Sequence, residues 1–190
     1  MFLQTPFSQP FLPGAGIVLL GILSAIAAGY DARFRRIPNW LVLAGIAAGF
    51  AWNVYSSGVS GLGTASAGLG TGFILYFPLY LLRARGAGDV KLLAAVGAVT
   101  GPVNCLWIFL LTAVLGGIIA VIILLFHGRL QKTFLNLSWI VRDLSQFRAP
   151  YQSSEDLDVT TSKGMRLPHG VLIAVGVTAF VIVAKSGLKV

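Results

Sequence analysis

Two aspartates, Asp31 and Asp89, are the carboxylates of the hydrophobic part of this sequence. The other acidic residues fall in one polar stretch near the C-terminus: Asp143, Glu155, Asp156 and Asp158. Two carboxylates held close together can share a proton, so that one acts as a general base on water while the other, protonated, polarises a carbonyl. Such a pair can cleave a peptide bond. Asp31 and Asp89 are therefore candidate catalytic residues, provided that the fold brings them together.

The composition indicates an integral membrane protein. Of the 190 residues, 56% are hydrophobic and 11% are charged, and the mean hydropathy is +0.85, far from the averages of soluble domains. Runs without any charged residue extend over residues 1–30, 37–82, 92–126 and 167–184. Because a helix needs roughly 20 apolar residues to cross a bilayer, these runs hold six spans.

We therefore predict an all-α integral membrane protein that forms a single membrane domain, residues 1–190, with six transmembrane helices. The fourth helix is short, because residues 92–126 are too few for two full spans and a loop at about 1.5 Å per residue. Thr100-Gly101-Pro102 supplies the break between the fourth and fifth helices. The predicted spans are about 12–30, 39–55, 63–82, 90–99, 103–126 and 168–184.

Glycines spaced four residues apart lie on several of these spans. Such pairs place small residues on one helix face and favour close helix packing. They occur as Gly45-x-x-x-Gly49, Gly68-x-x-x-Gly72 and Gly97-x-x-x-Gly101.

Residues 127–167 form the extended polar loop of the chain. Within it, apolar residues recur at helical spacing: Leu130, Phe134, Leu137, Val141 and Leu144. This pattern predicts an amphipathic helix between the fifth and sixth spans that lies in the membrane interface or packs against the end of the bundle.

The basic residues predict the orientation of the chain in the membrane. With six spans, 12 of the 14 Lys and Arg residues fall on one side, and Lys185 and Lys189 fall on the other. Since basic loops face the cytoplasm, we expect both termini outside, and Asp31, Asp89 and the 127–167 loop on the cytoplasmic side. The basic residues form no basic domain with aromatic platforms, so membrane lipids, and not nucleic acid, are the expected partners. The 12 residues are Arg33, Arg35, Arg36, Arg83, Arg85, Lys91, Arg129, Lys132, Arg142, Arg148, Lys163 and Arg166.

The sequence around each aspartate resembles a signature motif of the type IV prepilin peptidases, the bacterial GxGD intramembrane aspartic proteases. The two motifs read Asp31-x-x-x-Arg35-Arg36-Ile37-Pro38-Asn39 and Gly86-Ala87-Gly88-Asp89-Val90-Lys91-Leu92. The six-span plan and Leu167-Pro168-His169-Gly170, at the start of the last helix, extend the resemblance. It implies an aspartic endopeptidase of the bacterial inner membrane that removes the leader of prepilin or pseudopilin precursors at the cytoplasmic face. Asp31 and Asp89 would be its catalytic pair, and no cofactor is implied.

Other residues of the two motifs are candidates for supporting the site. The two glycines would let the backbone approach the substrate closely. The basic residues could hold the loop, pair with lipid phosphates or tune the charge of the acids, and we favour the structural and lipid-facing roles. Pro38 is expected to begin the second helix, and Asn39 to cap that helix or to bind near Asp31. The candidates are Gly86, Gly88, Lys91, Arg36, Pro38 and Asn39.

The chain also departs from the larger members of that family. Those members carry a cytoplasmic segment with two Cys-x-x-Cys pairs and methylate the new N-terminus, whereas here about eight residues separate the first two spans and Cys105 is the one cysteine. Methyltransferase activity is therefore not expected, and the short form resembles the peptidases of tight-adherence (Flp-type) pilus systems.

His127 and His169 are too few and too far apart in sequence to predict a metal site. The alternative function is a small proton-coupled transporter or a secretion-system membrane subunit, in which the aspartates relay protons or hold helices together.

Overall fold

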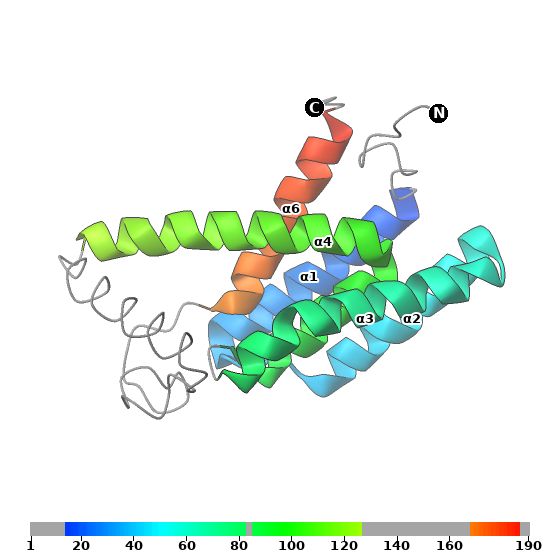
Figure 1. Cartoon of the computed structure of the whole chain (residues 1–190), viewed down its shortest axis with the longest axis horizontal. Coiled ribbons are helices and arrows are strands. Elements are labelled where there is room, and N and C mark those ends of the chain that lie inside the picture. Colours follow the sequence, from blue (N-terminus) through cyan, green and yellow to red (C-terminus); the bar gives the residue numbers. More distant parts are fainter. Residues whose placement is uncertain (1–13, 83–84, 127–167, 187–190) are drawn as a thin grey trace, which may run out of the picture.

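The computed structural model describes residues 14–82, 85–126 and 168–186. Over these ranges the chain is helical and contains no strand, which confirms the predicted all-α class. The predicted amphipathic helix and the polar loop of residues 127–167 lie outside the described ranges. Figure 1 shows the helices, which are α1 (Gly14–Phe34), α2 (Asn39–Ser57), α3 (Ser60–Leu81), α4 (Ala87–Phe126) and α6 (His169–Lys185).

Three stretches of the described chain are long and apolar enough to cross a membrane. They are Gly14–Phe34, Ser60–Leu81 and Ala87–Ile123. The α6 helix is apolar but shorter, and α2 is not among the three. The count of six spans remains a prediction.

Helix α4 is broken at Gly101, where the sequence predicts the end of a short fourth helix. Gly101 has φ 78° and ψ 173°, a conformation that glycine adopts without steric cost. Beyond it, the Cys105 thiol lies 3.9 Å from the carbonyl oxygen of Leu93. Twelve residues of unbroken helix would separate these residues by roughly 18 Å, so the chain turns back on itself at Gly101. Figure 1 shows the second half of α4 running back across the bundle.

Side chains from two helices donate hydrogen bonds to backbone carbonyls near this break. Pro102 has no N–H, so the carbonyl of Ala98 lacks the donor that a regular helix would provide four residues later. The Asn53 Nδ2 of α2 donates to that carbonyl oxygen at 3.0 Å, and the Asn104 Nδ2 donates to the carbonyl oxygen of Thr100 at 3.0 Å. Unsatisfied backbone groups are costly within a membrane, and these two amides reduce that cost.

The first half of α4, residues 87–100, is the centre of the bundle. Every residue from 92 to 101 is buried, and α3 packs against α4 as a whole more extensively than any other described pair of helices packs together. Gly68 of α3 and Gly97 of α4 face each other so closely that a Cβ on either would meet the carbonyl oxygen of the other. The close packing predicted from the glycine spacing is therefore present at this crossing.

Helices α3 and α4 begin at Ser60 and Ala87, three residues before their expected starts, and the end of α1 and the position of Pro38 also differ from the sequence-based expectation. Helix α1 continues to Phe34, past the expected end at residue 30, so that Asp31 lies in its last turn. Helix α2 begins at Asn39, and Pro38 precedes it in an extended conformation with φ −69° and ψ 138°. Pro38 therefore stands immediately before the helix and is not its first residue.

Candidate active site

Asp31 is a buried carboxylate at the end of α1. Only 7% of its surface is exposed, and its Oδ2 accepts a hydrogen bond of 2.6 Å from the backbone N–H of Gly170. Gly170 lies in the first turn of α6, where the N–H groups have no partner within the helix and where the helix dipole favours negative charge. A Cβ on Gly170 would lie 3.0 Å from both the Cβ and Oδ2 of Asp31. A side chain at this position would therefore displace Asp31 by a few tenths of an ångström.

Asp89 lies in the first turn of α4 and is half-buried. Its backbone N–H donates to the carbonyl oxygen of Gly86 at 3.1 Å, which closes the turn that leads into the helix. The next residue, Val90, is buried in the core. This packing fixes Asp89 at the mouth of the central helix.

The fold brings the two aspartates together at one end of the bundle. Asp31 and Asp89 lie within range of electrostatic repulsion between their carboxylates, and Arg85 lies within range of Asp89 to attract it. Two like charges at short range disfavour ionisation of both groups at once. The arrangement therefore suits a pair in which one carboxyl is ionised and the other carries a proton.

The glycines of the second motif lie beside Asp89 without tight contacts to other described residues. A Cβ on Gly88 would make ordinary contact with the Ile37 side chain at 3.5 Å, and one on Gly86 would approach no atom closer than the Asp89 Oδ2, at 3.8 Å. Packing within the described chain therefore does not require glycine at either position.

The remaining predicted residues lie on the outside of the same end. The exposed Lys91 Nζ donates to the Asn39 Oδ1 at 3.1 Å and so links the starts of α4 and α2. Asn39 therefore bonds to Lys91, and no side-chain hydrogen bond caps α2. Arg36 is exposed in the link between α1 and α2. The Pro38 carbonyl oxygen accepts the N–H of Leu41 at 3.2 Å in the first turn of α2.

Sequence reasoning did not pair two further residues beside the aspartates. The Tyr76 hydroxyl of α3 lies 2.7 Å from the His169 Nε2 of α6, and both side chains are buried. The sequence offered a signal for His169 and Gly170, in the Pro-His-Gly at the start of the last helix. It offered none for Tyr76, which stands among apolar residues of α3.

No group of three or more His, Cys, Asp or Glu residues with the geometry to hold a metal ion occurs in the described part of the chain. The polar groups at this end are two carboxylates, one buried phenol–imidazole pair and basic residues. Their chemistry is that of proton transfer and hydrogen bonding.

Comparisons with known proteins place the chain in a family. The family model described as type IV leader peptidase family matches residues 17–121. No curated protein and no solved structure gave a significant match. The matched region includes both aspartates and more than half of the 190 residues. The chain therefore belongs to the type IV leader peptidase family.

Proposed function

We propose that this protein is an aspartic endopeptidase that removes the leader peptide of type IV pilin-like precursors, with Asp31 and Asp89 as its catalytic pair. The observation that carries the proposal is the convergence of these two carboxylates at one end of the bundle. The match to leader peptidases supports the same reaction.

The two aspartates have distinguishable roles in this proposal. Asp31 accepts an N–H bond from Gly170, and such a bond suits the ionised partner, which acts as the general base. Asp31 takes a proton from water while the water oxygen attacks the carbonyl carbon of the scissile bond, and Asp89 gives its proton to the carbonyl oxygen. When the tetrahedral intermediate collapses, Asp31 returns its proton to the leaving nitrogen and Asp89 recovers a proton from the hydroxyl. Both carboxyls are then ready for the next cycle.

The site faces the cytoplasm of the bacterial inner membrane in this proposal, and both termini lie outside. Four arginines and one lysine lie at or beside the aspartate end among the described residues, and basic segments face the cytoplasm. These are Arg33, Arg35, Arg36, Arg85 and Lys91. The substrate is a prepilin or pseudopilin, whose leader lies in the cytoplasm ahead of a hydrophobic helix. The scissile bond would then lie near the inner face, beside the aspartates.

The short link between α1 and α2 supports a peptidase that does not methylate its product. Residues 35–38 separate these two helices, which leaves no room between them for the Cys-x-x-Cys segment of larger members. We therefore propose that the chain serves a tight-adherence (Flp-type) pilus system.

Separate substitutions of the two aspartates test the proposal. We expect Asp31→Asn and Asp89→Asn each to lower cleavage of a co-expressed pilin precursor by about 10²–10⁴-fold, the range that general acid–base groups contribute. A gel-mobility shift of the precursor measures this. Asp143→Asn, the same change at an acid outside both motifs, should cleave as the wild type does. If both active-site variants still process the precursor, the peptidase proposal is lost. If the wild type itself processes no precursor, the proton-coupled transporter becomes the better supported function.

A further inference from the structure

A hydrogen-bonded pair beside the catalytic aspartates takes no part in the proposed proton transfers. Tyr76 and His169 are 3% and 6% exposed, and the Tyr76 hydroxyl oxygen and His169 Nε2 are 2.7 Å apart. Tyr76 comes from α3 and His169 from α6, so the bond joins two helices that are far apart in the sequence. A buried polar pair in a membrane protein is costly to keep unless it contributes to function or to packing.

The position of His169 connects this pair to Asp31. His169 directly precedes Gly170, whose N–H donates to the Asp31 Oδ2. A bond that fixes the His169 ring to α3 therefore also fixes the first turn of α6 against the end of α1. A Cβ on Gly170 would lie only 3.0 Å from the Asp31 side chain, so this turn packs closely against Asp31.

The imidazole of His169 acts as a neutral group in this arrangement. Its Nδ1 is buried and has no hydrogen-bond partner among the described residues. A protonated ring would carry a second buried N–H with nothing to accept it, together with an uncompensated charge, and both are costly. The pair therefore works through geometry, by holding α6 to α3, and does not supply charge to the site.

We propose that Tyr76 and His169 are positioning residues for Asp31, a role that rests on the proposed peptidase function. Their bond sets the first turn of α6 so that the Gly170 amide holds the Asp31 carboxylate in the orientation that activates water. Neither residue touches the scissile bond.

Removing either half of the bond should lower the rate of the chemical step and leave substrate binding largely unchanged. We expect Tyr76→Phe and His169→Leu each to lower kcat by about tenfold, the worth of one hydrogen bond in a transition state, with KM within about twofold. The double variant should be no slower than the slower single variant, because each change removes the same bond. His169→Gln, whose amide can still bond to the hydroxyl, should recover much of the lost rate. Tyr80→Phe removes a hydroxyl one turn along α3 at an exposed site and should leave kcat unchanged.

The outcomes separate this inference from the function on which it rests. Purified wild type and variants are compared in detergent against one pilin-like precursor, and the amount of folded enzyme is measured by thermal unfolding. A normal kcat in Tyr76→Phe, multiplicative losses in the double variant, or no recovery in His169→Gln would each overturn the positioning role while leaving the peptidase intact. Failure of the wild type to cleave any precursor would overturn the proposed function and this inference with it.

Discussion

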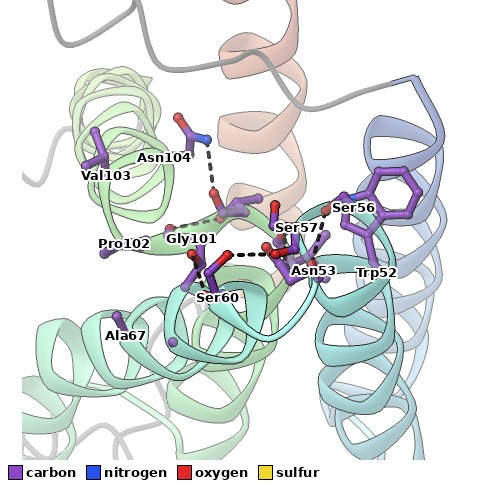
Figure 2. Close-up of a pocket in the computed structure, with 14 residues that line it drawn as sticks. Trp52, Asn53, Ser56, Ser57, Ser60, Ala67, Gly101, Pro102, Val103 and Asn104 are labelled. Atoms are coloured by element: carbon purple, nitrogen blue, oxygen red, sulfur yellow. Dashed lines mark hydrogen bonds between the residues drawn. The ribbon is translucent and has the colours of Figure 1, made fainter.

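The two ends of the central helix carry polar groups of opposite character. At the start of α4 lie the aspartates. At the break near Gly101 lies a pocket of about 820 Å³ between the α2–α3 turn and α4, shown in Figure 2. Its polar lining is uncharged and consists of Asn53, Ser56, Ser57, Ser60, Thr64, Thr100 and Asn104.

At the pocket, side-chain hydroxyls donate hydrogen bonds to backbone carbonyls. Ser56 donates to the carbonyl of Asn53, Ser60 to that of Ser57 and Thr100 to that of Val96. Such bonds within or beside one helix compensate turns and breaks. They leave few donors for a ligand.

Hydrogen bonds join different helices at both ends, but at the break the one from Asn53 goes to backbone carbonyls of α4, whereas at the aspartate end they hold a carboxylate and an imidazole. Gly170 of α6 holds Asp31 of α1, and Tyr76 of α3 holds His169 of α6. The carboxylates keep unused acceptor capacity among the described residues. Polar residues at the break thus stabilise the backbone, whereas those at the aspartate end position Asp31, which we propose as a catalytic group. Substitutions at the two ends should therefore separate stability from activity.

The largest effect in this comparison is expected from Gly170→Ala. The added Cβ would lie 3.0 Å from the Asp31 Oδ2 and would push the carboxylate away from its amide. A displacement of about 1 Å at a catalytic group can cost about 10²-fold in rate, so we expect the smaller shift here, a few tenths of an ångström, to lower the initial rate of precursor cleavage by about tenfold. Gly117→Ala is the matched control, because a Cβ there meets no atom within 4 Å. Equal rates for Gly170→Ala and the control would show that the Gly170 contact does not hold Asp31 for catalysis.

The sequence predicted those features that a short motif or the order of charged and apolar segments identifies. The Gly-Pro pair at residues 101–102 predicted the break in α4, and the break is present at Gly101. The spacing of charges predicted that Asp31 and Asp89 lie at one end of the bundle, and the fold brings them there. Each of these signals depends on residue types and on the order of apolar runs.

The sequence did not predict contacts between helices that are distant from each other along the chain. Tyr76 stands in an apolar helix and its partner lies 93 residues away, so nothing near it in sequence marks the bond. The Asn53 side chain of α2 supplies the hydrogen-bond donor that Pro102 of α4 lacks. Both pairings depend on how helices cross, which is set by the packing of side chains and not by periodicity.

The next largest effect, on stability and not on activity, is expected from Asn53→Ala. This change removes the Nδ2 that donates to the Ala98 carbonyl and leaves a buried acceptor without a partner. Such a loss costs about 1–3 kcal/mol in the free energy of unfolding. We expect a lower thermal midpoint in detergent, with kcat per folded molecule within about twofold of the wild type. Ser56→Ala, which removes a partly buried bond within α2, should destabilise less. A tenfold loss of kcat in folded Asn53→Ala would instead show that the two ends of α4 are coupled.

The smallest effect is expected from Lys91→Ala, because Lys91 lies at the exposed edge of the aspartate end. Its bond to the Asn39 Oδ1 is exposed to solvent, and water replaces such a bond at little cost. We therefore expect the free energy of unfolding to change by less than about 0.5 kcal/mol, and kcat to stay within about twofold of the wild type. Urea or thermal unfolding and precursor cleavage measure the two quantities, and Asn39→Ala should match Lys91→Ala in both. If Lys91→Ala alone raises KM, Lys91 contacts the substrate, and the reactive region then extends beyond the buried residues to the exposed start of α4.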